Sequence, residues 1–370
     1  MKKILFLIHD LGYGGAERVL VNLANGMDKS KYEVYVQTLF DIGANRENLN
    51  SQVHYIAGAK RVFRGNATFM KALSSRALAK IVIKGEYDLV VSFLEGPCSR
   101  IVSGYNGKKV AWIHTIHSSS QEMAAYFRSE KEMRNCYDSF DAIFCVANTV
   151  KDNFQRISET RATCKTLYNV NETDDIIKKS RETQDIIKKS EEYISIITCG
   201  RLINKIKGFD RLIKIHKRLL DEGISNKLYI LGEGPDKEKL LKLISELDIE
   251  NTCFLLGFHN NPYKYYKSAD LFVCSSFVEG FSTAVTEALI LGLPVVSTDV
   301  SGAYELLGKN NEYGVVCNKE DEALFDVVKK LCSSRELLEK YKEAAKVRGT
   351  AFHSKNALLA AEKEIDGLLR

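Results

Sequence analysis

Long apolar runs are missing from this sequence, and no segment approaches the roughly 18 apolar residues that a membrane span needs. The amino terminus, MKKILFLIHDLG, resembles a signal peptide, but its apolar run stops at Ile8, before His9 and Asp10. We interpret it as a first strand. The expected location is therefore the cytoplasm, with membrane contact only at a surface.

Cysteine pairs are missing too. The nine cysteines show no CxxC spacing and no metal-like pairing with histidine, and their number is odd. Several lie in apolar runs such as FVCSS and IITCG, which indicates buried free thiols in a reducing compartment. An acid pair of the DxD type at a strand end is also missing, so we expect no metal and no other cofactor.

The length and charge of the chain limit the number of domains and the kinds of partner to expect. At 370 residues the chain exceeds one ordinary core, and two domains are expected. The net charge of +5 is uneven, because residues 1–170 carry 23 Lys and Arg against 16 Asp and Glu. No recognised nucleic-acid-binding module accompanies this basic half, so nucleic acid is not an expected partner.

Short apolar runs recur along the chain and alternate with amphipathic helical stretches. Uninterrupted apolar runs are typical of parallel strands that are covered on both faces. The strand-like runs are KILFLI, YEVYVQTL, YDLVVSFL, KVAWIHT, DAIFCVA, CKTLYN, YISIITCG, KLYILG, TCFLLG, DLFVCSS, LPVVSTD and YGVVC. Helices are expected over residues 16–27, 69–84, 208–222 and 236–247. The alternation predicts an α/β protein with two doubly wound sheets.

A tandem repeat marks the junction between the two expected domains. ETDDIIKKSR (172–181) is followed by ETQDIIKKSE (182–191), with eight identities. We interpret residues 171–192 as a charged helix or a lengthened linker, because two short copies cannot form a solenoid. The first domain is then expected over 1–170 and the second over 193–351. The last residues, 352–370, have helical spacing, which by itself does not assign this helix to a domain, and packing back on the first domain is the arrangement considered.

A glycine-rich turn follows the first strand. Gly12, Gly14 and Gly15 allow a tight turn into a helix whose amino terminus offers free N–H groups to an anion. A dinucleotide fingerprint would need glycine at Glu17, so a Rossmann dehydrogenase is not supported. Without other motifs, a turn that binds no ligand explains these glycines equally well.

A basic turn opens the second half. Arg201 follows a strand, and Lys205 and Lys207 precede a helix that begins near Gly208. Arginine supplies a planar fork and lysine a compact charge, which suits a pyrophosphate at the mouth of a sheet. On charge alone, a solvated basic loop is the simpler explanation.

Further strand ends in the second half carry glycine or acid. KLYILGEGPD and TCFLLGFHNN turn at Gly232 and at Gly257 and Phe258, where backbone groups could hydrogen-bond a nucleobase. In EGFSTAVTE, Glu279 is expected in a loop at the carboxyl end of the sheet, with Glu287 roughly two turns into the next helix. That separation favours two contacts to one ligand over an acid and base acting on one bond.

Four segments together make the chain similar to glycosyltransferase family 4, whose members are retaining enzymes of the GT-B fold that use sugar nucleotides. The segments are GGAERVLVNLA, GRL…KGFDRLI, LGEGP and EGFSTAVTEALILGLPVVSTDVSGAYELL. The resemblance covers nearly the whole chain and implies two Rossmann-like domains facing a central cleft. It is strongest for bacterial members that build capsule, O-antigen or other surface polysaccharides.

The resemblance implies a role for each motif position. Glu279 would contact the donor sugar and Glu287 the ribose, while Arg201 and Lys207 would clamp the donor diphosphate. Lys205 is the alternative to Lys207, because five residues separate Arg201 from Lys207 and the family usually has four. Other donor-binding positions are expected at Gly14, Gly15, Gly232, Gly257, Phe258, Gly280, Phe281 and Ser282.

WIHTIH matches the segment that carries the family's sugar-contacting histidine. His114 fits that position best, and His117 is the alternative. The resemblance implies that this histidine hydrogen-bonds the donor sugar and does not accept a proton as a conventional base. The segment CVANTVKDNF departs from the family, which often has serine where Ala147 stands.

The resemblance implies an enzyme that moves a hexose or N-acetylhexosamine from a nucleotide diphosphate sugar, most commonly a UDP-sugar, to a lipid-linked saccharide. Arg201 and Lys207 would stabilise the leaving diphosphate without a metal. A nucleotide-sugar epimerase of similar architecture is one alternative. A non-catalytic subunit that binds sugar nucleotides is another.

The segment GAKRVFRGNATFMKALSSRALAKIVIK (58–84) holds seven Lys and Arg and no acid. Apolar residues such as Val62, Phe63 and Phe69 are interleaved with these charges. Such a segment could bind an anionic lipid surface, at the inner face of the plasma membrane, and bring the cleft to a lipid-linked acceptor. The alternative is a solvated basic helix that packs its apolar side inward.

Overall fold

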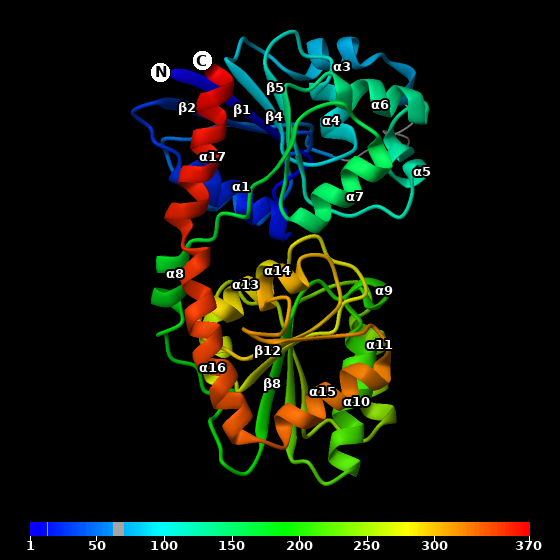
Figure 1. Cartoon of the computed structure of the whole chain (residues 1–370), viewed down its shortest axis with the longest axis vertical. Coiled ribbons are helices and arrows are strands. Elements are labelled where there is room, and N and C mark those ends of the chain that lie inside the picture. Colours follow the sequence, from blue (N-terminus) through cyan, green and yellow to red (C-terminus); the bar gives the residue numbers. More distant parts are fainter. Residues whose placement is uncertain (13, 62–69) are drawn as a thin grey trace. The chain divides into compact units, whose positions relative to one another are not determined.

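The computed structural model describes residues 1–12, 14–61 and 70–370 of the chain. This described part divides into two compact units, one formed by Met1–Val170 with Ser354–Arg370 and the other by Asn171–His353. Each unit is built on one sheet of parallel strands with helices packed on it (Figure 1). The expected α/β class with two doubly wound sheets is confirmed.

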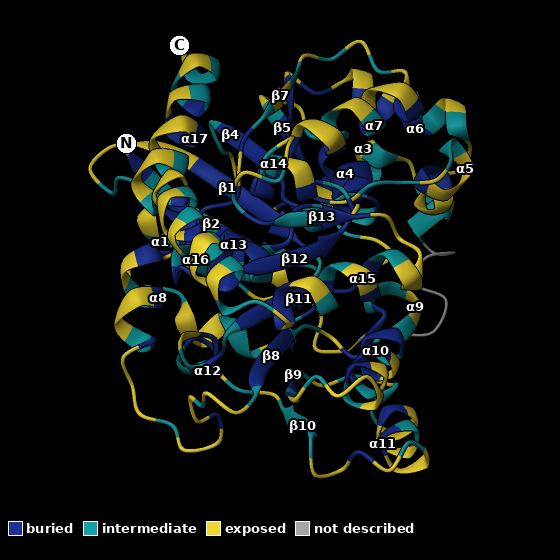
Figure 2. Ribbon diagram, turned by 60° about the horizontal axis from the view of Figure 1, so that its bottom comes forward, coloured by how far each residue is buried: buried dark blue, intermediate teal, exposed yellow. Residues whose placement is uncertain are grey.

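The first sheet has seven strands in the order β3-β2-β1-β4-β5-β6-β7. The strands are β1 (Lys2–Ile8), β2 (Tyr32–Thr38), β3 (His54–Ile56), β4 (Leu89–Ser92), β5 (Lys109–Ile113), β6 (Ala142–Cys145) and β7 (Cys164–Thr166). The central strands are buried along nearly their whole length, as their uninterrupted apolar runs require (Figure 2). β3 has no counterpart among the expected strands, because HYI is too short and too polar to form an apolar run.

The second sheet has six strands in the order β10-β9-β8-β11-β12-β13. The strands are β8 (Ile194–Cys199), β9 (Asn226–Leu231), β10 (Cys253–Gly257), β11 (Leu271–Cys274), β12 (Val295–Thr298) and β13 (Val315–Cys317). The chain winds outward from β8 in one direction and from β11 in the other, so the strand order reverses between them. In open α/β sheets, ligands bind at the carboxyl ends of the strands at such a reversal.

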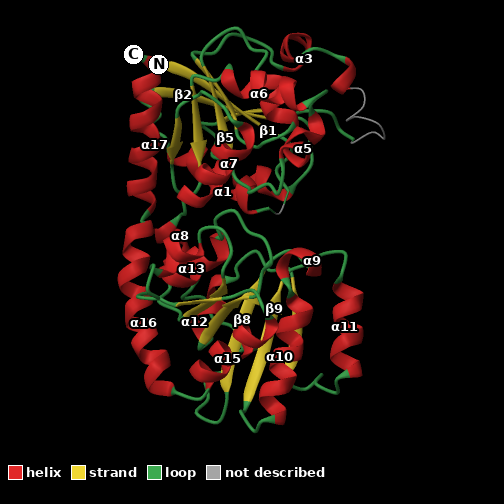
Figure 3. Cartoon of the chain, turned by 45° about the vertical axis from the view of Figure 1, so that its right-hand side comes forward, coloured by secondary structure: helices red, strands yellow, loops and turns green. Residues whose placement is uncertain are grey.

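Helices cover both faces of the second sheet (Figure 3). One face carries α10 (Phe209–Asp221), α11 (Lys237–Glu246) and α15 (Asp321–Cys332), and the other carries α12 (Tyr263–Ser268), α13 (Thr283–Ile290) and α16 (Arg335–Gly349). The remaining helices of this unit are α8 (Thr173–Lys179), α9 (Asn204–Lys207) and α14 (Ala303–Leu307), with a 3-10 turn, η3, over Thr350–Phe352. Leu212, Leu240 and Phe325 pack into one apolar core against the sheet.

In the first unit, the described helices are α1 (Gly15–Gly26), α3 (Ser75–Val82), α4 (Pro97–Val102), α5 (Ser120–Met123), α6 (Glu130–Asp138), α7 (Asn148–Ser158) and α17 (Ser354–Leu369), with 3-10 turns η1 (Ala44–Asn48) and η2 (Ala124–Tyr126). The terminal helix α17 joins this unit although it is the last element of the chain. The backbone N–H of Asp28 donates to Glu362 of α17 at 2.7 Å, and the Tyr32 hydroxyl donates to Asp366.

The two copies of the tandem repeat adopt different structures, and both belong to the second unit. The first copy forms α8 and buries Ile176, whereas the second copy forms no helix and buries Ile187. The two buried isoleucines are not equivalent, because Ile176 aligns with Ile186 in the repeat. Residues 171–192 therefore fold onto the second unit, where a charged helix or linker between domains was expected.

Candidate active site

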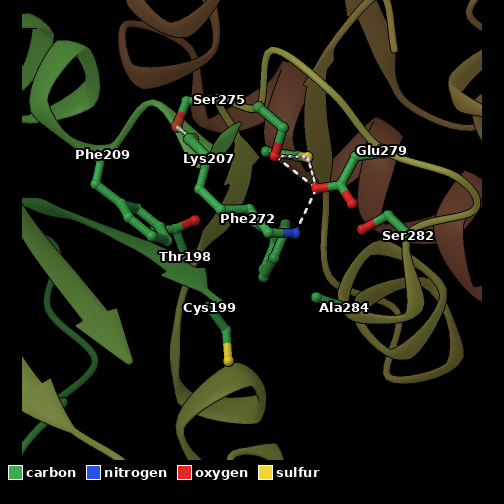
Figure 4. A pocket seen from close by; sticks show the side chains of 11 residues that line it. Thr198, Cys199, Lys207, Phe209, Phe272, Ser275, Glu279, Ser282 and Ala284 are labelled. Atoms are coloured by element: carbon green, nitrogen blue, oxygen red, sulfur yellow. Dashed lines mark hydrogen bonds and ion pairs between the residues drawn. The ribbon is translucent and has the colours of Figure 1, made fainter. Parts of the chain in front are cut away.

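A small pocket lies at the carboxyl edge of the second sheet, where β8 and β11 end (Figure 4). Its walls come from β8, α9, β11 with the loop that follows it, and the start of α13. The lining residues are Thr198, Cys199, Lys207, Phe209, Phe272, Cys274, Ser275, Ser276, Glu279, Ser282 and Ala284. The pocket therefore occupies the point of strand-order reversal at which an open α/β sheet binds its ligand.

Lys207 and Glu279 form an ion pair in this pocket. The Nζ atom of Lys207 lies 2.6 Å from Oε1 of Glu279, and the two side chains are 24% and 11% exposed. The Ser276 hydroxyl donates to the same carboxylate oxygen at 2.6 Å, and the Cys274 Sγ lies 4.0 Å from it. All of these contacts fall on Oε1, and Oε2 accepts no hydrogen bond from the described residues (Figure 4).

The ion pair controls the charge of the lysine. Burial is the largest single influence and lowers the pKa of Lys207, but the Glu279 carboxylate, together with the Cys274 and Cys199 side chains, raises it, and the pKa ends above its ordinary value of 10.5. Burial also raises the pKa of the Cys274 thiol, so this side chain stays neutral beside the carboxylate. The pocket thus holds one firm positive charge at neutral pH.

Gly208 brings α9 and its lysine against the end of β11. The residue has a φ of 62°, and a Cβ atom there would lie 2.4 Å from the carbonyl oxygen of Ser275. The close approach lets the Ser275 hydroxyl donate to the Lys207 carbonyl at 2.9 Å, and lets the Phe277 N–H donate to the Ile206 carbonyl at 2.7 Å. Any side chain at Gly208 would separate the two segments.

Arg211 of α10 stabilises the loop after β11 by hydrogen bonds. Its guanidinium is buried and donates to the carbonyl oxygens of Ser275 and Ser276, and also to that of Lys319 at 2.6 Å. The same group lies over the Phe277 ring, 4.0 Å from its centroid. Neither Arg211 nor Ser276 was given a role by the sequence, although both lie in segments quoted above, KGFDRLI and DLFVCSS.

Glu287 lies closer to the start of its helix than expected. The helix α13 begins at Thr283, and the Ser282 side chain caps it by accepting from the Val285 N–H. Glu287 is therefore the fifth helical residue, little more than one turn along, where two turns were expected. Its side chain is 3% exposed, and the Tyr263 hydroxyl donates to it at 3.4 Å.

The other basic residues of the turn after β8 point elsewhere. Arg201 is exposed, and its side chain makes no hydrogen bond or ion pair with the part of the chain that the structure describes. Lys205 is also exposed, and it is not among the residues that line the pocket. Of the two lysines left open by the motif spacing, Lys207 is the one that contacts Glu279.

The glycines at the ends of β9 and β10 serve close backbone packing. Gly232 has a φ of 139°, and a Cβ atom there would lie 1.9 Å from the Gly200 carbonyl oxygen. Its N–H donates to the Gly257 carbonyl at 2.8 Å, so the strand ends lie side by side. Phe258 beyond them is 44% exposed, whereas Phe281, between Gly280 and α13, is buried.

The remaining predicted positions belong to the first unit. Gly14 is the N-cap of α1 and Gly15 its first residue. His114 follows β5 and is 7% exposed, and its Nε2 has no hydrogen-bond partner among the described residues. Burial lowers the pKa of His114 to about 3, so its ring is neutral. The Glu95 carboxylate fixes the backbone here by accepting the His114 N–H at 2.7 Å.

His117, the alternative histidine, also has two ring nitrogens without a hydrogen bond to any described residue. Its side chain is 16% exposed, and its Nδ1 lies 3.9 Å from Oε1 of Glu122. The Asn153 amide instead holds the His117 backbone, accepting its N–H and donating to its carbonyl at 3.0 Å each. Hydrogen bonds to the backbone thus fix the position of both histidines, while His114 Nε2 and both ring nitrogens of His117 make no hydrogen bond to a described residue.

Within the described residues, no group of three or more His, Cys, Asp and Glu side chains could hold a metal ion. No helix in the same part of the chain is long and apolar enough to cross a membrane. Of the basic segment 58–84, residues 62–69 lie outside the described residues, and Val62, Phe63 and Phe69 are among them. Its described helix, α3, buries Leu78 and exposes Ile81.

Family models match both units of the chain. Residues 13–174 match the model described as Glycosyltransferase Family 4, and residues 179–348 match the one described as Glycosyl transferases group 1. A Campylobacter jejuni relative, N-acetylgalactosamine-N,N'-diacetylbacillosaminyl-diphospho-undecaprenol 4-alpha-N-acetylgalactosaminyltransferase, is 31% identical over 95% of this chain and 96% of its own length. A second relative from the same organism, GalNAc-alpha-(1->4)-GalNAc-alpha-(1->3)-diNAcBac-PP-undecaprenol alpha-1,4-N-acetyl-D-galactosaminyltransferase, is 27% identical over 87% of this chain and 86% of its own.

Solved structures of similar shape cover the whole chain. The Anabaena protein HepE in complex with UDP and glucose matches with a TM-score of 0.76 and 16% identity, over 99% of this chain and 100% of that one. At such an identity the likeness shows the fold alone. It confirms the expected GT-B architecture of two Rossmann-like domains.

Proposed function

Since the chain belongs to the glycosyltransferases of family 4 and group 1, we propose that it transfers a hexose or N-acetylhexosamine from a UDP-sugar to a lipid-linked saccharide, with retention of the anomeric configuration. Two relatives that match most of the chain are named as enzymes acting on undecaprenol-linked saccharides. A neighbour in fold binds UDP and glucose. Surface polysaccharide synthesis is the process that fits these acceptors.

The Lys207–Glu279 pair at the strand-order reversal is the observation that carries the proposal. Cleavage of the bond between sugar and diphosphate builds negative charge on the leaving oxygens. Lys207 supplies a preorganised positive charge at that place, and Arg201, exposed and without a protein partner among the described residues, can turn to the same diphosphate. The charge is provided by side chains, so we assign no metal to this step.

Glu279 has a second task in this proposal. Its Oε1 takes the contacts from Lys207 and Ser276, which leaves Oε2 to accept hydrogen bonds from sugar hydroxyls. Glu287, buried under Tyr263, is assigned to the ribose. The Nε2 of His114, a weakly basic atom in a neutral ring, is assigned to a hydrogen bond with the donor sugar.

A turnover assay with matched variants tests these assignments. Membranes with lipid-linked saccharides are incubated with individual UDP-sugars, and the elongated product is identified. We expect Lys207→Ala to lower kcat about 100-fold or more, as loss of an electrostatic transition-state contact does, and Lys205→Ala to leave it nearly unchanged. Glu279→Ala and Arg201→Ala are expected to abolish turnover while circular dichroism shows a folded protein.

Two results would count against the proposal. Equal rates for the Lys207 and Lys205 variants would remove Lys207 from the site. Conversion of a UDP-sugar into its epimer in the absence of acceptor would point to the epimerase alternative.

We also propose that the basic segment 58–84 holds the protein at an anionic membrane surface. The described part of the segment supports this with Arg76, Lys80 and Lys84, which have no acidic partner among the described residues. Changing these three residues to glutamate is expected to reduce co-sedimentation with phosphatidylglycerol vesicles at low salt. Unchanged sedimentation would refute the membrane contact.

A further inference from the structure

A second hollow lies at the amino edge of the second sheet, the edge opposite the candidate active site. Asp270 and Pro294, which directly precede β11 and β12, form its floor. One wall is Lys189 to Glu191, the end of the second repeat copy, and the other is α16. The strand ends that line the candidate active site take no part in this hollow.

The hollow is lined by more cations than anions. The cations are Lys189, Lys267, Arg335, Lys342 and Lys346, and the anions are Glu191, Asp270 and Glu339. Each anion has a cation near it: Asp270 lies 3.6 Å and Glu191 4.0 Å from Arg335, and Glu339 lies 2.7 Å from Lys342. Lys189 and Lys267 form no ion pair with a described residue, although the positive charge of Lys189 acts on the pKa of Asp270 and of Glu339.

The unpaired lysines repel one another. Burial lowers the pKa of Lys267, and the positive charges of Lys189, Lys346, Lys342 and Arg181 lower it further. Five cations against three anions leave an excess of positive charge that opposes folding, and an anion bound among the lysines would reduce that cost. The arrangement is therefore suited to an anionic ligand.

The hollow is also shaped by the backbone. A Cβ atom on Gly292, whose φ is 68°, would lie 2.5 Å from Cγ of Lys346, so glycine lets this lysine cross the turn before β12. Arg335 donates to the carbonyl oxygens of Ser190 at 2.7 Å and Tyr193 at 3.0 Å, which fixes the wall that carries Lys189. Arg335, Lys342 and Lys346 also form ion pairs with acidic residues, which leaves Lys189 and Lys267 as the two cations without an ion pair to a described residue.

We propose that this hollow binds a phosphate group between Lys189 and Lys267, with Lys342 and Lys346 at its rim. Lysine binds phosphate as a compact point charge with three donors, and such charge-assisted hydrogen bonds are the strong ones. The phosphate belongs either to a soluble polyphosphate compound or to a lipid headgroup. The second repeat copy, which had no role in donor binding, then forms one side of a ligand site.

Pyrophosphate binding tests the proposal. Isothermal titration is performed at low salt on the Arg201→Ala, Lys207→Ala protein, so that the donor site does not contribute. We expect pyrophosphate to bind this protein, and Lys189→Glu with Lys267→Glu to weaken binding about 100-fold. Lys214→Glu with Lys309→Glu, the same charge change at exposed lysines outside both pockets, should leave it within about 2-fold.

A vesicle assay separates the two sources of phosphate. Loss of sedimentation with phosphatidylglycerol vesicles in the Lys189→Glu, Lys267→Glu protein identifies a lipid headgroup, and unchanged sedimentation with weakened pyrophosphate binding identifies a soluble compound. If neither assay distinguishes this protein from the Lys214→Glu, Lys309→Glu control, the hollow is not a phosphate site.

Discussion

His114 illustrates how burial fixes the chemistry of a single side chain. Its pKa is lowered to about 3, whereas in the unfolded chain it returns to an ordinary value of 6.5. Between these two values the unfolded chain binds a proton that the folded chain does not, so stability is complete above pH 6.5 and falls as the pH drops. The slope from one such group is about 1.4 kcal/mol per pH unit.

We therefore expect His114→Gln to make the free energy of unfolding less dependent on pH. The free energy of unfolding is measured with urea at pH 7 and at pH 5.5. Its decrease between these two pH values should be about 1 kcal/mol smaller in this variant than in the wild type. His353→Gln is the control, because His353 is 44% exposed. Identical pH dependence in His114→Gln and wild type would show that His114 takes up its proton in the folded state as well.

At the residue scale, local motifs indicated where Lys207 and Glu279 lie, but not the long-range contacts that hold the backbone around the candidate site. Lys207 and Glu279 stand in motifs whose spacing places them at strand ends, and they meet in the structure. Arg211 holds carbonyl oxygens 64 and 65 residues away, a contact that no local pattern encodes. Glu95 likewise fixes His114 across a gap of 19 residues.

At the scale of elements, the tandem repeat shows one sequence in two structures. The copies differ at Asp174 and Gln184 and at Arg181 and Glu191. Asp174 lies in the first turn of α8, where an acid is favourable. Gln184 instead accepts from the N–H groups of Ile186 at 2.9 Å and Ile187 at 2.8 Å, and its amide donates to Ser268 at 2.8 Å. These bonds stabilise a turn that competes with the helix.

Exchange of the distinguishing residue tests this explanation. Gln184→Asp removes the donor to Ser268 and shortens the side chain, so we expect a loss of about 1–3 kcal/mol in the free energy of unfolding and faster hydrogen exchange at Ile186 and Ile187. Asp174→Gln is the control: Asp174 is 88% exposed, so its change should stay within about 0.5 kcal/mol. Equal losses for both variants would mean that Gln184 does not direct the second copy.

Helices and strands with a strong apolar pattern were predicted from the sequence, whereas those with a weak pattern were missed. The expected helix over 208–222 is observed as Phe209–Asp221, because its apolar face packs on the sheet. The edge strand β3 escaped prediction, since a strand of three residues has no apolar pattern. For the repeat, a charged helix and a lengthened linker were both left open, and the first copy forms a helix whereas the second does not.

At the scale of the molecule, each unit has a core of its own, and chain order does not decide which unit an element joins. The terminal helix α17 belongs to the first unit because Ala361 and Ile365 are buried there. Amphipathic spacing identified this helix and its buried face, but no spacing states which partner covers that face. The two-unit organisation itself follows from chain length, since one core does not serve 370 residues.

The single tryptophan makes the contribution of α17 measurable. Trp112 is buried in β5, so its fluorescence reports the unfolding of the first unit alone. Ile365 is 0% exposed, and Ile365→Ala should lower the stability seen by fluorescence by about 2–5 kcal/mol through the cavity it leaves. Leu359→Ala, on the same helix at 53% exposure, should change it by less than about 0.5 kcal/mol.

The second unit serves as an internal reference in the same experiment. A protein of two units is not expected to unfold in one step, so the fluorescence transition and the transition of the remaining far-ultraviolet dichroism are analysed separately. If Ile365→Ala shifts only the fluorescence transition, α17 stabilises the first unit. If it leaves that transition in place, or if Leu359→Ala shifts it equally, then the buried face of α17 does not stabilise the unit to which the helix is assigned.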